Sequence, residues 1–496
     1  MRLKDCARLL LAAIVGLTVV AVGCNKTGGG ATASADSGKI PITTKSEEAK
    51  KEFVLGRDMF ERLLANDSLQ HFDKAIELDP DFASAELARA NASPSAKEFF
   101  EHLNKAVALA DRSSEGEKLL IAAAKAATNG DVVTQKDDLE KLVAAYPNDE
   151  RAHFTLGGYY FGQQEYGPAI EHYKKATELN PGYSTAFNIL GYAYRQQGDY
   201  ANAEQAFKKY TELIPNDPNP YDSYAELLLK MGRFEDSIAQ YRKALSVDPH
   251  FNASHFGIAA DLLYLGKADD AMAELQRMAE GARNDGELRT AYFGMAVVAS
   301  DRGKFDDAVQ EMDKQYGIAE KKNDVAGMAG DLQAKGNILA QTAQYDLAAQ
   351  SFDKSLQLIQ GSSLSQEIKD NAMLQHEFNL TVVALGKKDL AGAKTHAEAY
   401  RKGAEVSKNP LQMKQAHELA GRIALAQKDY GTAITELEQA NSQNPQNLLR
   451  LSEAYKAKGD AAKAKDYCKQ AADFNSLPQL NYAFVREKAQ KMAGKA

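Results

Sequence analysis

Residues 189–215 read ILGYAYRQQGDYANAEQAFKKYTELIP, and two helical patterns meet in this stretch at a single glycine. Apolar and small side chains recur at helical spacing on both sides of it: Leu190, Gly191 and Tyr194 before, and Ala203, Phe207 and Tyr210 after. Gly198 favours the left-handed end of a first helix, and Asp199 favours the start of a second. Pro215 prevents the second helix from continuing. The stretch therefore predicts a helical hairpin.

The sizes of the residues indicate how closely the two helices of this hairpin pack. Gly191 and Ala203 are small at the positions where the helices are expected to approach each other. Tyr194 and Phe207 are large, and we expect them to fill the wedge between the helices. The tyrosines of the stretch are thus mainly structural, and Tyr192 is the exception.

The hairpin is one unit of a repeat with a period of 34 residues. Three sets of residues keep this step: Pro147, Pro181, Pro215 and Pro249; Gly198, Gly232 and Gly266; and Ala169, Ala203, Ser237 and Ala271. Such self-similarity is typical of solenoids, in which each unit buries its apolar face against its neighbours. We therefore interpret the 496-residue chain as a repeat array.

The pattern resembles the tetratricopeptide repeat, most strongly over residues 115–250, and residues 155–181 are nearly ideal. The tryptophan that is frequent in the family is missing, and Phe187, Tyr221 and His255 stand in its place. The resemblance implies an all-α fold, an α-solenoid with a right-handed superhelix of about ten or eleven helix-turn-helix units.

The spacing of the repeats suggests how the chain is organised. We expect an N-terminal repeat block over residues 46–280 and a C-terminal block with longer repeats and longer helices over residues 281–477. The stretch EGARNDGELRT, residues 280–290, interrupts the regular step as either a long loop or a hinge. Residues 478–496 are expected to form a capping helix and tail that shield the end of the array.

The first 23 residues have the composition of a signal peptide, with basic residues before the apolar run Leu9–Val22. This run is short for a membrane span, which needs about 20 residues. The sequence AVGC that follows resembles the lipobox of bacterial lipoproteins, although Ala21 replaces the usual leucine-like residue. The resemblance implies a lipid on Cys24 and anchoring in the bacterial cell envelope, and Asn25 favours the outer membrane facing the periplasm. A short anchor that is never removed is the alternative.

Residues 24–45 are rich in glycine, serine, threonine and alanine, and this composition predicts a flexible tether. Cys6 would leave with the signal peptide and Cys24 would carry lipid, so no disulfide framework is expected. Cys468 falls on a helix face that should be buried.

Catalytic and nucleic-acid-binding patterns were sought along the whole sequence. The net charge of −8, without a dense Lys/Arg cluster, argues against nucleic acid as a partner. HEFNL at His376 and HELAG at His417 begin like a zinc-protease motif but lack its second histidine. Neither a phosphate-binding loop nor a nucleophile elbow is present. We therefore expect no enzyme, no metal and no cofactor.

The tetratricopeptide resemblance implies that the first helices of the units form a concave wall that binds a protein or peptide. Carried over by position, the wall residues are Phe154, Phe161, Asn188, Tyr192, Arg195, Asp222, Glu226, Phe256 and Tyr264. Aromatic anchors among polar groups suit a peptide groove, but the same aromatics could instead pack against the next repeat. Asp222 and Glu226 disfavour the family's clamp for C-terminal carboxylates. We expect a lipid-anchored envelope scaffold, with a solute-binding accessory of a transport system as the alternative.

Overall fold

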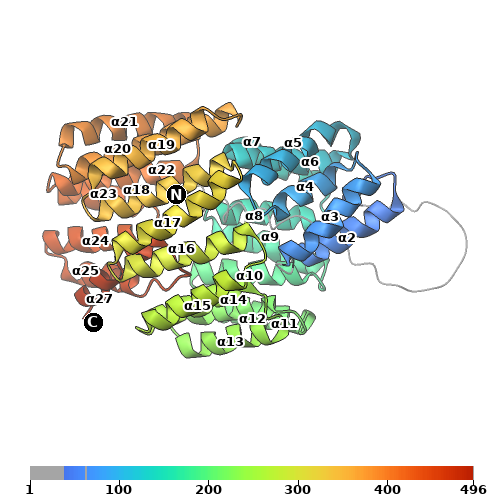
Figure 1. The fold of residues 1–496 in the computed structure, drawn as a ribbon, viewed down its shortest axis with the longest axis horizontal. Helices are drawn as coiled ribbons and strands as arrows, with labels where there is room; N and C mark the ends of the chain where they lie inside the picture. The colour runs from blue at the N-terminus through green and yellow to red at the C-terminus, as the bar shows by residue number, and fades with distance from the viewer. Residues whose placement is uncertain (1–37, 62–63, 495–496) are drawn as a thin grey trace, which may run out of the picture. The chain divides into compact units, whose positions relative to one another are not determined.

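The computed structural model describes residues 38–61 and 64–494, and these residues are almost entirely helical (Figure 1). No β-strand occurs within these two ranges. The chain divides into two compact units between Tyr224 and Ala225, inside α12 (Asn219–Lys230). We refer to the part before this boundary as unit 1 and the part after it as unit 2. The predicted signal peptide and Cys24 lie outside the described residues.

Consecutive helices pack as pairs in both units. Unit 1 contains α2 (Glu47–Glu61), α3 (Ala65–Leu78), α4 (Ala83–Ala92), α5 (Ala96–Leu109), the 3-10 helix η1 (Ala110–Arg112), α6 (Glu115–Asn129), α7 (Val132–Ala145), α8 (Glu150–Gly162), α9 (Tyr166–Leu179), α10 (Ser184–Gln197) and α11 (Tyr200–Leu213). Unit 2 contains α13 (Phe234–Val247), α14 (Asn252–Tyr264), α15 (Ala268–Glu280), α16 (Asp285–Asp301), α17 (Phe305–Lys321), α18 (Val325–Gln341), α19 (Tyr345–Gln360), α20 (Gln366–Gly386), α21 (Leu390–Ser407), α22 (Pro410–Ala426), α23 (Tyr430–Gln439), α24 (Pro445–Lys458), α25 (Ala461–Ala472), α26 (Leu480–Ala483) and α27 (Arg486–Met492). Among the described residues, no helix is both long and apolar enough to span a membrane.

The hairpin predicted at residues 189–215 is formed by α10 and α11. Gly198 ends α10 with a φ of 87°, and the Asp199 carboxylate accepts a hydrogen bond of 3.1 Å from the Asn202 N–H at the start of α11. A Cβ atom added to Gly191 would lie 2.7 Å from the ring of Phe207, so the ring occupies the space beside the glycine. The predicted close approach of the two helices is therefore confirmed.

The helix pairs are more numerous than the sequence indicates. Between α2 and α25, the described residues contain twelve consecutive pairs, where ten or eleven were expected. The pair α4–α5 is short and lacks the glycine that marks the turn in the regular units. The expectation of longer helices further along is confirmed, because α16 to α22 have 16 to 21 residues.

The predicted interruption at residues 280–290 is a short connection. α15 ends at Glu280 and α16 begins at Asp285, and both helices belong to unit 2. The side chain of Asn284 caps α16 by accepting a 2.9 Å hydrogen bond from the Glu287 N–H. A capped four-residue connection takes the place of the long loop or hinge.

Polar pairs occupy the place of the missing tryptophan in several units. Each pair joins the first helix to the second across 19 residues: Glu52 with His71, His153 with His172, His255 with Glu274, Glu377 with His396, and His417 with Glu436. The contacts measure 2.5 to 3.1 Å between a histidine Nδ1 atom and its partner. These units therefore replace a large apolar side chain with a hydrogen bond between helices.

Candidate functional site

The structure places the nine predicted wall residues in two environments. Four of them are buried in helix packing: Phe154, Asn188, Asp222 and Phe256. The ring of Phe154 lies between those of Tyr173 and Tyr183, with centroid distances of 5.4 and 5.2 Å. The packing of Phe154 agrees with the alternative interpretation, in which the aromatic wall residues contact the next repeat and not a peptide. The remaining five are partly exposed: Phe161, Tyr192, Arg195, Glu226 and Tyr264.

Three of the partly exposed residues form an aromatic patch on α8 to α10 in unit 1. The ring of Tyr192 packs edge-on against Phe207 at 5.2 Å, and the Arg195 guanidinium lies 4.6 Å from the centre of the Tyr192 ring. Phe161 packs against Tyr166 at 5.7 Å. Burial raises the pKa of Tyr166 to about 12, although the positive charge of Arg195 opposes the shift. We define Phe161, Tyr166, Tyr192 and Arg195 as the aromatic patch.

The surface around Tyr264 in unit 2 is covered by the C-terminal segment, residues 473–486. The Nζ atom of Lys230 on α12 donates a 2.5 Å hydrogen bond to the Phe474 carbonyl and lies 4.3 Å from the centre of the Phe474 ring. The hydroxyl of Tyr264 on α14 donates a hydrogen bond to the Ser476 carbonyl. Burial under the segment raises the pKa of Tyr264 well above its usual value.

Apolar and charged anchors fix the same segment on α16. Leu480, which is 1% exposed, belongs to a core cluster with Val297 on α16 and Ile338 on α18. Arg486 donates a 2.6 Å hydrogen bond from Nε to the carboxylate of Asp301. The end of the chain was expected to form one capping helix. Instead it forms two short helices within unit 2: α26 packs against α16, and α27 packs against α25.

Residues 38–45 form an equivalent cover on unit 1, which we call the N-terminal strap. The Ile40 N–H donates to the Asp149 carboxylate at 2.7 Å, and the Arg151 guanidinium donates to the Ile40 carbonyl at 2.6 Å. Further along, the Thr43 N–H donates to Glu117 at 3.0 Å. The tether predicted for residues 24–45 therefore does not include the strap, which is bound to the folded unit. Residues 24–37 lie outside the described range.

The residues considered for catalysis have structural contacts. His417 pairs with Glu436 at 2.7 Å, and His376 contacts Asp353 at 3.2 Å. Within residues 38–61 and 64–494, no cluster of three or more His, Cys, Asp or Glu side chains is arranged to hold a metal ion. Cys468 is buried, as predicted, and burial raises the pKa of its thiol.

Comparison with known proteins identifies the repeats. A family model described as tetratricopeptide repeat matches residues 136–184, 156–218 and 225–287, and a second model with the same description matches residues 446–476. A solved structure entitled "Crystal structure of MamA protein" is similar to 34% of this chain and 91% of its own, with 23% identity and a TM-score of 0.29. No curated protein matches the chain.

Proposed function

We propose that this chain, which contains tetratricopeptide repeats, is a lipid-anchored scaffold of a bacterial cell envelope, on the outer membrane facing the periplasm. Its repeats support a role in binding other proteins. The proposed anchor is a lipid on Cys24, for which the support is the lipobox-like sequence AVGC after a short apolar run. Protein binding of this kind requires neither a cofactor nor catalytic residues.

The aromatic patch of unit 1 is the proposed contact for a protein or peptide partner. Tyr192 and Phe161 provide partly exposed rings, and Arg195 adds a positive charge beside Tyr192. Rings and guanidinium groups are the side chains that most often dominate binding energy at interfaces. Tyr264, the partly exposed aromatic wall residue of unit 2, contacts the C-terminal segment instead, and this contact favours the assignment to unit 1.

Photo-crosslinking in intact cells tests the partner site. A photoreactive amino acid at Tyr192 is expected to capture one dominant envelope protein, identified by mass spectrometry. The matched control is the exposed residue Lys209 on α11 of the same hairpin. If both positions capture the same diffuse set of proteins, or neither captures any, the aromatic patch is not a docking surface.

Metabolic labelling tests the anchor separately. Incorporation of a radiolabelled fatty acid into the wild-type chain, and its loss in Cys24→Ser, is the expected result. Labelling that persists in Cys24→Ser would contradict the assignment of the lipid to this residue.

A solute-binding accessory lipoprotein is the second candidate, because such a role needs an enclosed pocket. Unit 1 contains one beneath the N-terminal strap, lined in part by Ile40 and Arg57.

A further inference from the structure

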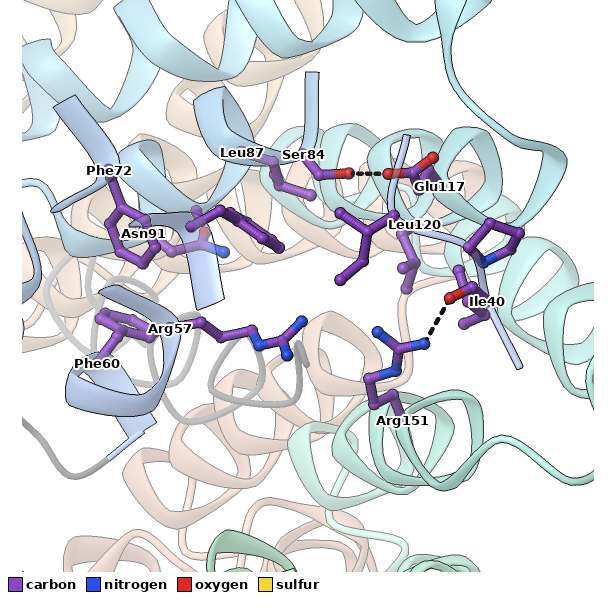
Figure 2. A pocket seen from close by; sticks show the side chains of 14 residues that line it. Ile40, Arg57, Phe60, Phe72, Ser84, Leu87, Asn91, Glu117, Leu120 and Arg151 are labelled. Atoms are coloured by element: carbon purple, nitrogen blue, oxygen red, sulfur yellow. Dashed lines mark hydrogen bonds between the residues drawn. The ribbon is translucent and has the colours of Figure 1, made fainter. Parts of the chain in front are cut away.

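The pocket beneath the N-terminal strap brings two buried arginines together. It has a volume of about 30 Å³ and lies between the strap and helices α2, α3, α4, α6 and α8 of unit 1. Figure 2 shows Arg57 of α2 and Arg151 of α8 extending their guanidinium groups toward each other across this space. Their exposed fractions are 2% and 1%, so the pocket holds both charged groups away from solvent.

Arg57 differs from Arg151 in its hydrogen bonds. The guanidinium of Arg151 donates to the carboxylate of Asp149 at 2.9 Å and to the Ile40 carbonyl at 2.6 Å. Neither terminal nitrogen of Arg57 has a hydrogen-bond acceptor among the described residues. Its guanidinium instead lies 5.3 Å from the centre of the Phe53 ring. Burying a guanidinium group without hydrogen-bond acceptors is unfavourable, because no hydrogen bonds offset the free-energy cost of removing its charge from water.

Electrostatics agree with this geometry. Burial lowers the pKa of Arg57 to about 10; the negative charge of Glu61 opposes the shift and the positive charge of Arg151 adds to it. Glu117 also lines the pocket, but its carboxylate already accepts hydrogen bonds from Thr43, Ser84 and Ser114. An anion between the two guanidinium groups would supply the acceptors that Arg57 lacks and reduce their mutual repulsion.

The size and the walls of the pocket restrict the kind of anion. A single water needs about 10–15 Å³ of such volume, so the pocket accommodates a group of roughly three non-hydrogen atoms. Phe60, Leu87 and Leu120 contribute apolar side chains to the wall. Sulfate and phosphate carry oxygens in all directions and would leave some of them unpaired against this wall. A carboxylate presents both oxygens on one side and matches the planar fork of a guanidinium.

One further polar group faces the pocket. The side-chain oxygen of Asn91, which is 7% exposed, has no hydrogen-bond donor among the described residues. Turning its amide by 180° presents the NH₂ group instead, and this group can donate to an anion.

We propose that this pocket binds a small free monocarboxylate of the size of formate or acetate. Arg57 donates to both oxygens of the carboxylate, Arg151 and Asn91 flank it, and its hydrogen or methyl group faces Leu87 and Leu120. The strap residues Ile40 to Ile42 close the pocket. This site is independent of partner binding at the aromatic patch. For the second candidate function, solute binding, the proposed ligands are small monocarboxylates.

Thermal unfolding of the purified full-length chain tests the proposal, with formate, acetate, chloride and sulfate compared at equal ionic strength. We expect formate and acetate to raise the Tm relative to chloride by about 2 °C at ten times the Kd, and sulfate not to do so. The increment grows with the logarithm of the carboxylate concentration. Equal Tm values in all four anions would overturn the proposal.

Arg57→Met removes the donors and keeps most of the side-chain volume. We expect this variant to lose the response to carboxylates. The matched control is Arg89→Met on α4, whose guanidinium already pairs with Asp73 and Glu98. This control should retain the carboxylate response. A response that persists in Arg57→Met would contradict the assignment to this pocket.

A direct measurement on the wild type covers the case in which the Arg57 variant does not fold. We expect the wild-type chain to broaden the NMR lines of ¹³C-labelled acetate, and we expect excess formate, but not chloride, to reverse this broadening. Absence of the broadening would overturn the proposal. A tetrapeptide with a free C-terminal carboxylate should not compete, because the pocket is too small for it. Competition by this peptide, but not by its C-terminal amide, would show that the site recognises polypeptide ends instead.

Discussion

The two units carry terminal segments that are held in different ways. On unit 1, residues 38–45 belong to no helix, and the main-chain groups of Ile40 bond to Asp149 and Arg151 while its side chain is buried. On unit 2, residues 473–486 are bound through the carbonyls of Phe474 and Ser476 and, in addition, through the side chains of Leu480, Tyr482 and Arg486. Main-chain bonds depend little on the identity of the bound residues, whereas side-chain anchors depend on it strongly. Substitutions within the two segments should therefore have unequal effects.

The largest effect is expected from Arg486→Ala in the C-terminal segment. The carboxylate of Asp301 is 3% exposed, and losing this cation leaves a buried negative charge, which costs about 3–5 kcal/mol. Hydrogen exchange in α16 and α26 measures the change where it occurs. Lys488→Ala is the control, because Lys488 is exposed and its partner Glu453 is partly exposed, and such pairs contribute about 0–1 kcal/mol. Equal effects of the two substitutions would mean that Arg486 does not anchor the segment.

The direct comparison of the two segments uses Leu480→Ala and Thr43→Ala. Leu480→Ala creates a cavity beside Val297 and should cost about 2–4 kcal/mol. Thr43→Ala removes one acceptor, which receives the Ser114 N–H at 3.1 Å, and should cost about 1 kcal/mol because the main-chain bond to Glu117 remains. Hydrogen exchange in the helices that contact each segment measures both free-energy changes. If Thr43→Ala costs as much as Leu480→Ala, the distinction between main-chain and side-chain attachment fails.

The strap also predicts a pH dependence through Asp149. Burial alone would raise the pKa of this carboxyl, but the charge and hydrogen bonds of Arg151 and the Ile40 N–H outweigh burial and lower it. The stabilisation is therefore complete above the ordinary pKa of about 3.9 and is lost as the pH falls below it. Asp149→Asn should cost about 2–3 kcal/mol at pH 7 and much less at pH 2.5, as measured by urea unfolding. A cost that does not change with pH would exclude this ion pair as the source.

A substitution in the α10–α11 hairpin measures how much packing within one regular repeat contributes to the free energy of unfolding. Gly191→Ala places a Cβ atom 2.7 Å from the Phe207 ring, and overpacking of this kind costs about 1–3 kcal/mol. Thermal unfolding measures the loss, and Gly167→Ala is the control because an added Cβ there meets no atom within 4 Å. A smaller loss for Gly191→Ala than for the control would mean that the close approach of α10 and α11 is not tight.

The hairpin was predictable because its signals are local. Gly198, Asp199 and Gly191 act on neighbours within one repeat, and the 34-residue period shows where the pattern recurs. The helix pair α4–α5 lacks the glycine at its turn, and the pairs from α16 to α23 depart from the 34-residue step. Periodicity therefore gives the type of unit reliably and the number of units less so.

The terminal segments could not be predicted, because their contacts connect residues that are far apart in the sequence. Ile40 bonds to a side chain 109 residues away, and Lys230 bonds to a carbonyl 244 residues away. The burial of the wall residues could not be predicted for the same reason. The repeat position of Phe154 is clear from the sequence, but its burial depends on Tyr183, which belongs to the next unit. The pocket at Arg57 left no local signal, since its lining comes from five helices and the strap.

The smallest effect is expected at the polar pairs, where one repeat of unit 1 differs from one of unit 2. His255 contacts the carboxylate of Glu274 in unit 2, whereas His153 faces His172 in unit 1, with 3.1 Å between the Nδ1 atoms. Burial lowers the pKa of both unit 1 histidines, and the proximity of His153 lowers that of His172 further. Their folded state therefore binds fewer protons than the unfolded state near pH 6. The stability of the folded state is therefore highest above the ordinary histidine pKa and decreases as the pH falls below that pKa.

His172→Glu gives unit 1 the arrangement of unit 2 and should reverse this dependence. A carboxylate at this position accepts a hydrogen bond from protonated His153, so the variant should gain about 1 kcal/mol relative to the wild type at pH 5.5 and less at pH 8. Urea midpoints at the two pH values measure the difference. His250→Glu is the control, since His250 is an exposed residue between α13 and α14, outside these pairs. If both variants shift equally with pH, the pairing between helices does not determine how the repeats respond to acid.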